Sequence, residues 1–115
     1  MIIKLKINDR ATLAIKNKTK RIEIRANNKP EYSLLKENDL IEFSSVSYGT
    51  YYCLVEEVNY YKTLEELYML EGTRYTTSST NDFNEAINNA NKINGYADAI
   101  KENGVYAIHI KYLSW

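Results

Sequence analysis

Alternating hydrophobic and polar residues mark two runs of the chain as strands. Between Met1 and Ile7, isoleucine and leucine alternate with Lys4 and Lys6, the period of two expected of a half-buried strand. The run from Val105 to Leu113 alternates in the same way after a turn at Gly104. Both runs are therefore predicted to be strands.

Three runs between them also have strand character. Arg21 to Arg25 alternates charged residues with isoleucine, so its isoleucines share one face and its charges the opposite, solvent-facing one. Leu40 to Phe43 follows a turn, and Tyr51 to Tyr61 is rich in β-branched, aromatic and aliphatic residues. Ser44 to Thr50 is predicted to be the hairpin loop that connects these two strands.

Capping patterns predict the helices. Asp9 is a candidate cap for a short helix that reaches about Asn17. Thr63 and Glu66 have the spacing of a capping box, which predicts a helix from about Leu64 to Glu71.

A further helix and the fold class follow from the same signals. Asp82 and Glu85 repeat the capping spacing ahead of a hydrophobic stripe of helical period that reaches Ile93. Four or five strands with three or four short helices between them predict an α+β domain built around a small mixed or antiparallel β-barrel. We expect residues 1–115 to form a single domain, because this length is near the common size of one domain.

Composition indicates a folded protein of a reducing compartment. Hydrophobic residues make up 44% and charged residues 26% of the chain, which is far from the signature of disorder. No apolar run of about 18 residues occurs, so no membrane segment is predicted and we expect a cytoplasmic location. Cys53 is the one cysteine, and its place in a strand-like run favours a role as a small hydrophobic residue.

Charge is unevenly distributed along a chain that is neutral as a whole. Fifteen basic and fifteen acidic residues cancel, which excludes the footprint of a tight, nonspecific nucleic-acid binder. Six of the basic residues nevertheless fall between Lys16 and Lys29, where Glu23 is the one acid. The part of this segment from Lys16 to Arg25 is the candidate working surface.

The same segment resembles the signature of the ASCH family. That signature is a glycine, a lysine, and then a glutamate and an arginine two residues apart; the last three fall on Lys20, Glu23 and Arg25. Residues 35–43, 61–67 and 105–110 resemble three further blocks of the family in the same order. The resemblance implies a PUA-like barrel with a cleft beside the signature, in a family regarded as RNA-binding and, in some members, hydrolytic.

Two positions depart from the family pattern. Lys18 stands at the glycine position, and Asn17 is the alternative candidate for the positive φ that this glycine would adopt. Glu23 stands where the small acetylcytidine amidohydrolases that resemble this family have a threonine nucleophile. That nucleophile is therefore not carried over, no catalytic residue is assigned, and enzymatic activity stays open.

The expected site is a basic cleft. Its cations would hold a phosphate or a carboxylate-bearing ligand while Glu23 accepts hydrogen bonds from a base edge; the alternative is a row of exposed ion pairs on a strand. Tyr48 and Tyr75 are candidates for stacking on a base, and the alternative is that they pack against the barrel. The candidate binding residues are Lys18, Lys20, Arg21, Glu23, Arg25, Tyr48 and Tyr75.

Three hypotheses of function follow. The first is a small module that binds RNA or a nucleotide-like small molecule; the second is a hydrolase acting on a modified nucleoside or on RNA. The third is a protein-interaction domain that binds an acidic partner through the same face. His109 is the one histidine, so we predict no metal site and no other cofactor, and no pattern specifies an oligomeric state.

Overall fold

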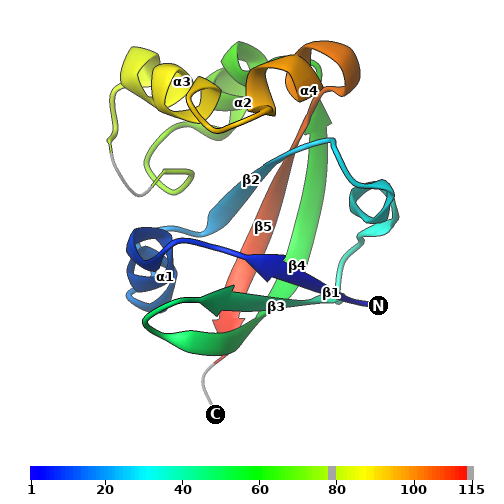
Figure 1. Cartoon of the computed structure of the whole chain (residues 1–115), viewed down its shortest axis with the longest axis vertical. Helices are drawn as coiled ribbons and strands as arrows, with labels where there is room; N and C mark the ends of the chain where they lie inside the picture. Colours follow the sequence, from blue (N-terminus) through cyan, green and yellow to red (C-terminus); the bar gives the residue numbers. More distant parts are fainter. Residues whose placement is uncertain (78–79, 114–115) are drawn as a thin grey trace.

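The computed structural model describes residues 1–77 and 80–113, and Figure 1 shows how their elements are arranged. The described strands are β1 (Ile2–Lys6), β2 (Ile22–Ala26), β3 (Leu40–Ser45), β4 (Gly49–Tyr61) and β5 (Val105–Leu113). The described helices are α1 (Asp9–Lys16), α2 (Leu64–Glu71), α3 (Phe83–Asn91) and α4 (Tyr96–Asn103), with a short 3-10 helix at Pro30–Leu34. The predicted α+β class is confirmed.

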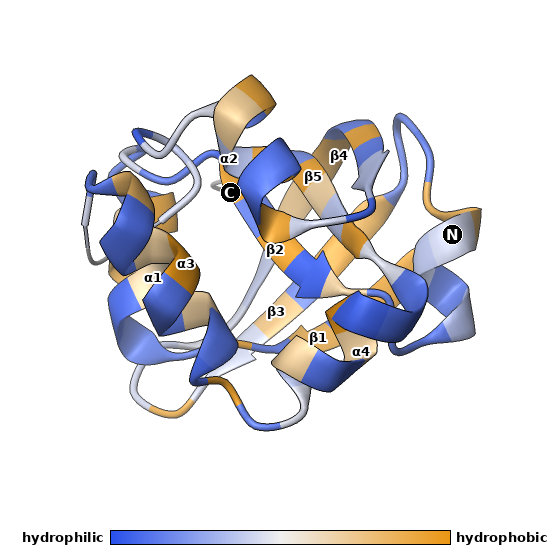
Figure 2. Cartoon of the chain, turned by 90° about the horizontal axis from the view of Figure 1, so that it is seen from above, coloured by the Kyte–Doolittle hydropathy of each residue, from blue (hydrophilic) through white to orange (hydrophobic). Residues whose placement is uncertain are grey.

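The five described strands form one curled, mixed sheet in the order β1-β3-β4-β5-β2. β1 pairs with β3 in parallel, and the other three pairings are antiparallel. The sheet curls into a half-barrel, which Figure 2 shows from above. β1 and β2 are its two edges, so the barrel is open between them.

Each face of the sheet is covered by a different hydrophobic cluster. Along β5, Tyr106 and Ile108 belong to the cluster inside the half-barrel, whereas Val105 and Ala107 belong to a second cluster that also includes residues of α2, α3 and α4. Figure 1 shows these three helices together at one end of the long strands, with α1 near the other end. Cys53 is fully buried in the inner cluster, and burial raises the pKa of its thiol to about 12.

Side-chain caps determine where three helices begin. Thr63 accepts a hydrogen bond of 3.1 Å from the backbone N–H of Glu66, and Asp82 accepts one of 2.8 Å from the backbone N–H of Glu85. The starts of α2 and α3 are therefore as predicted. The prediction for α1 was wrong by one residue, because Asn8 and not Asp9 is its cap.

Several boundaries differ from the prediction for local reasons. The hairpin loop is shorter than the predicted Ser44 to Thr50, because β3 continues to Ser45 and β4 begins at Gly49. The 3-10 helix and α4 have no side-chain cap: Pro30 starts the first, and Gly95, with a φ of 80°, precedes the second. None of the described helices has both the length and the apolar character needed to cross a bilayer.

Candidate functional site

Strand β2 places the charged residues of the signature on the inner face of the half-barrel. Glu23 and Arg25 lie opposite Ile108 and Tyr106 of β5, and both of these partners belong to the inner cluster. Glu23 is 6% exposed, and the Arg25 side chain is 14% exposed. The prediction of a solvent-facing charged face was therefore wrong, because a curled sheet with helices outside covers both faces of this strand.

A fork of hydrogen bonds joins these two residues. Oε2 of Glu23 accepts a bond of 2.9 Å from Nε of Arg25 and one of 2.6 Å from its Nη2. Charge-assisted pairs of this kind are stronger and more directional than neutral hydrogen bonds. The other carboxylate oxygen, Oε1, lies 3.4 Å from Nζ of Lys20. The carboxylate is therefore held between two cations.

Lys20 is buried, at 6% exposure, and its ammonium group is fully engaged. Nζ donates to the backbone carbonyls of Ile22, at 2.9 Å, and Thr76, at 2.7 Å. The carboxylate of Glu23 is a third neighbour, in an ion pair at 3.4 Å. Two backbone hydrogen bonds and one ion pair thus hold the ammonium group of Lys20 inside the site.

Burial and charge act in opposite directions on these groups. Burial alone would raise the pKa of Glu23, but the charges of Arg25 and Lys20 and their hydrogen bonds outweigh it and hold the pKa below its ordinary value. Burial alone would lower the pKa of Arg25, but the nearby carboxylate raises it. For Lys20, burial outweighs the attraction of Glu23, and its pKa is lowered. Glu23 and Arg25 are therefore both ionised at neutral pH.

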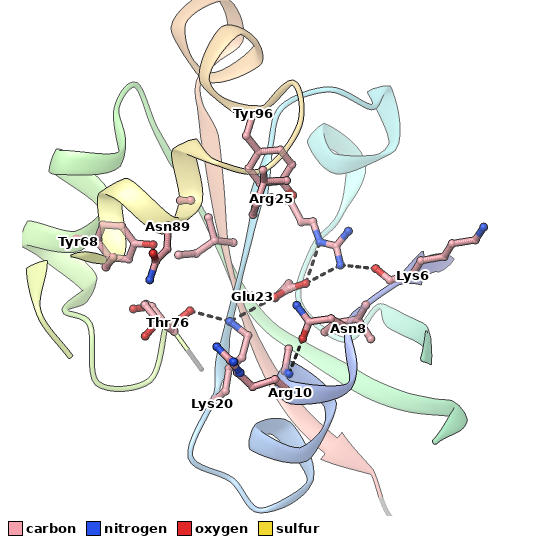
Figure 3. A pocket seen from close by; sticks show the side chains of 17 residues that line it. Lys6, Asn8, Arg10, Lys20, Glu23, Arg25, Tyr68, Thr76, Asn89 and Tyr96 are labelled. Carbon is pink, nitrogen blue, oxygen red and sulfur yellow. Dashed lines mark hydrogen bonds and ion pairs between the residues drawn. The ribbon is translucent and has the colours of Figure 1, made fainter. Parts of the chain in front are cut away.

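A cavity of about 640 Å³ opens beside this network. Four basic residues and one acidic residue line it: Lys6, Arg10, Lys20, Arg25 and Glu23. Figure 3 shows Lys20 and Arg25 on either side of Glu23, with Arg10 of α1 nearby, whereas the side chain of Lys6, at the end of β1, points away from Glu23. Lys6 and Arg10 are exposed, and neither forms an ion pair with another residue in the described ranges.

The opposite wall of this first cavity is largely apolar. It is contributed by α2, α3, the turn after α3 and the start of α4, through the residues Tyr68, Ala86, Ala90, Ile93 and Tyr96, with Asn89 of α3 as a polar member. The cavity therefore combines a charged floor with an apolar wall. This combination suits a flat ring with polar groups along one edge.

A second cavity, of about 560 Å³, contains three basic side chains and no acidic one among its described lining residues: Lys18, Arg21 and Arg74. The guanidinium carbons of Arg21 and Arg74 lie 4.6 Å and 5.1 Å from the ring centroid of Tyr75. Thr77 lines both cavities, so the two adjoin at this residue.

The predicted site residues thus fall into three groups: those at the first cavity, those at the second cavity, and Tyr48, which is at neither. Lys20, Glu23 and Arg25 are together at the first cavity, and Lys18, Arg21 and Tyr75 are together at the second. Tyr48 lines neither cavity; the ammonium of Lys16 lies 5.7 Å from its ring centroid.

The turn before β2 also differs from the expectation. Lys18 itself has the positive φ, of 67°, whereas Asn17 has a φ of −90°. Asn17 instead accepts hydrogen bonds from the backbone and the hydroxyl of Thr19. The suggestion that Asn17 takes the glycine conformation was therefore wrong.

Sequence reasoning missed three basic residues. Lys6 is the last residue of β1, Arg10 lies in the first turn of α1, and Arg74 comes from the segment after α2. The one sequence signal for Arg74 is its position next to Tyr75, which was singled out as a stacking candidate. His109 lies in neither cavity and contacts Glu71 at 2.8 Å and Glu57 at 3.4 Å.

The fold has close counterparts among solved structures. The crystal structure of the hypothetical protein PH0355 superposes with a TM-score of 0.86 at 21% identity, covering 98% of this chain and 100% of that one. The solution structure of protein PF0455 from Pyrococcus furiosus gives a TM-score of 0.78 at 23% identity, covering 100% of both chains. No family model and no curated protein matches the chain. At this identity, the likeness shows the fold alone.

Proposed function

We propose that the chain is an ASCH-like module that binds RNA or a nucleotide, with a base in the first cavity. The observation that carries this proposal is the carboxylate of Glu23, which is buried and held between Lys20 and Arg25 at the floor of a basic cavity. A carboxylate in such a position is a fixed hydrogen-bond acceptor.

The chemistry of this floor suits the edge of a base. An ionised carboxylate offers about four lone-pair sites, and Oε1 of Glu23 lies 3.4 Å from the ammonium of Lys20. Oε1 can therefore accept an N–H group from the amino or imino edge of a base. The apolar wall, with Ala90 and Ile93, would cover the face of the ring.

The backbone of the preceding turn supports the family resemblance. The ASCH signature has glycine at the position of Lys18, and glycine is the residue that tolerates a positive φ without strain. Lys18 has a φ of 67°, so the backbone here has the conformation that a glycine signature demands. The turn thus combines a glycine-like backbone with a lysine side chain.

Binding is favoured over hydrolysis by the hydroxyl groups at the cavity. Thr76 donates its hydroxyl to the carbonyl of Gly72 at 2.8 Å, and the hydroxyl of Thr77 donates to the carbonyl of Thr80. Neither hydroxyl donates to a carboxylate or a histidine that could activate it as a nucleophile. We therefore expect binding without turnover.

Binding across ionic strength tests the proposal. Fluorescence anisotropy with short single-stranded RNA, single-stranded DNA and fluorescent nucleosides should show binding of at least one RNA or nucleoside. For a strand, affinity should fall by about 0.7 log units per log unit of salt for each phosphate contacted.

A matched pair of exposed variants makes the test specific to the cavity. Arg10→Gln removes a lining cation and should weaken binding, whereas Lys101→Gln, at the far end of α4, should leave binding unchanged. Absence of binding to all of these probes at low salt would refute the proposal. Binding to an acidic protein instead would favour the interaction-domain hypothesis.

A further inference from the structure

The second cavity gathers like charges without a counter-charge. Lys18, Arg21 and Arg74 form no ion pair with any residue of the described ranges, and the two arginines share the ring of Tyr75. Bringing cations together in this way costs free energy unless an anion is bound, because like charges repel.

Backbone contacts hold this arrangement in place. The backbone N–H groups of Arg21 and Ile22 both donate to the carbonyl of Tyr75, at 2.9 Å and 3.0 Å. Nε of Arg21 donates to the carbonyl of Lys18 at 3.1 Å. These bonds connect the turn before β2 to the segment that carries Arg74. The backbone therefore holds Lys18, Arg21 and Arg74 near one another.

Strain at Lys18 is the second, independent observation. A non-glycine residue at positive φ is strained, and such strain is concentrated at functional sites. Lysine has no side-chain oxygen that could stabilise this backbone as asparagine does. A lysine at a positive φ that lines a cavity with three basic residues and no acidic one among its described lining is best explained by a need for its charge.

We infer that the second cavity is a phosphate subsite. This inference rests on the proposed function, because the phosphate belongs to the nucleotide or RNA strand whose base enters the first cavity. Planar guanidinium groups match the geometry of phosphate oxygens, and the hydroxyl of Thr19 and the amide of Asn81 are further polar groups of the lining. The shared residue Thr77 places the phosphate next to the base.

A titration with inorganic phosphate tests the subsite by itself. In NMR spectra, the backbone amides of residues 18–21 and 73–77 and the Nε–Hε signals of Arg21 and Arg74 should shift saturably. Arg74→Gln should abolish this saturation. No shift at millimolar phosphate, or the same binding in Arg74→Gln, would overturn the inference.

A comparison of ligands with and without a phosphate group tests which class of ligand uses the subsite. The four ribonucleosides, their 5′- and 3′-monophosphates and a short RNA should be compared, and phosphorylated forms should bind at least tenfold more tightly, the effect of a charged hydrogen bond. A preference for monophosphates over RNA identifies a free nucleotide, and the reverse identifies a strand. Equal affinity for nucleosides and all phosphorylated forms would overturn the subsite while leaving the proposed function standing.

The strained lysine allows a sharper test. Lys18→Gly should raise Tm by relieving strain, yet reduce affinity for phosphorylated ligands about tenfold, with nucleoside affinity little changed. Asn38→Gly is the matched control, because Asn38 also has a positive φ, of 75°, and lines neither cavity. It should leave all affinities unchanged. Unchanged phosphate affinity in Lys18→Gly would show that its charge is not used for binding.

Discussion

Nη2 of Arg25 donates a hydrogen bond of 2.9 Å to the backbone carbonyl of Lys6. These residues belong to β2 and β1, the two strands at opposite edges of the sheet order. No strand pairing joins β1 to β2 among the described ladders, so this side chain bridges the opening of the half-barrel. Glu23 orients the same guanidinium group. The candidate site and the closure of the barrel therefore share one network.

Arg25→Lys should loosen this opening. A lysine has one ammonium group and cannot reproduce the planar fork to Glu23 together with the bond to Lys6. Amide hydrogen exchange in β2 should become about tenfold faster, which corresponds to about 1.4 kcal/mol of local stability.

Arg10→Lys is the control for this exchange measurement. Arg10 is exposed, and no ion pair of the described residues includes it. The Arg10→Lys variant should therefore show the same amide hydrogen exchange in β2 as the wild type. If Arg25→Lys also matched the wild type, the bond to Lys6 would have no role in holding the edges together.

Glu23→Gln should be strongly destabilising. The change leaves two buried cations, Lys20 and Arg25, without their carboxylate, and breaking a buried ion pair in this way costs about 3–5 kcal/mol. Urea denaturation should show this loss, whereas Glu56→Gln, at an exposed position of β4, should change stability by at most about 0.5 kcal/mol. Similar midpoints for the two variants would mean that Glu23 is solvated in solution.

Glu23 was expected to be exposed and is buried, and this difference has a physical reason. Alternation in Arg21 to Arg25 correctly predicted a strand, because a period of two is a property of the backbone itself. The pattern also suggested that the charged face is solvated, as in a flat sheet with one covered face. How far the sheet curls depends on contacts between distant segments, and the alternation from Arg21 to Arg25 contains no information about those contacts.

The composition of the two cavities was predictable only in part. The basic cluster between Lys16 and Lys29 supplies Lys18, Lys20, Arg21 and Arg25 to the two cavities, and these cations lie close together in the sequence. Lys6, Arg10 and Arg74 are brought to these cavities by the end of β1, the start of α1 and the segment after α2. α4 was missed because Gly95 starts it without the polar cap that a sequence search relies on.

Acid should destabilise the wild type partly through Glu23. Its pKa in the folded protein lies below the ordinary value of 4.5, so the unfolded chain binds a proton first as the pH falls. Its contribution is therefore fully present above about pH 4.5 and is lost as the pH falls through the folded-state pKa.

The difference in stability between wild type and Glu23→Gln isolates this effect. Measured by urea denaturation, it should be constant from about pH 5 to pH 8 and shrink below about pH 4.5. A difference that stays constant down to pH 3 would show that the pKa of Glu23 is the same in the folded and unfolded states.

Lys20→Arg should damage the fold, although a lysine that acts only as an exposed phosphate cation tolerates arginine. The ammonium of Lys20 fits between two backbone carbonyls and the carboxylate of Glu23. A guanidinium group is larger and planar, so it cannot direct its donors to all three acceptors from the same place. Overpacking of this kind typically costs about 1–3 kcal/mol, which thermal or urea denaturation would detect.

Two comparisons separate this positioning role from direct ligand binding. Lys101→Arg, an exposed change in the last turn of α4, should melt like the wild type. Lys20→Met removes the charge and leaves the carbonyls of Ile22 and Thr76 without their donor, so it should lose at least as much stability as Lys20→Arg. At temperatures where Lys20→Arg is still folded, nucleoside affinity should fall because Glu23 is misplaced. Wild-type stability together with wild-type affinity in Lys20→Arg would show that the ammonium group is free to bind a ligand after all.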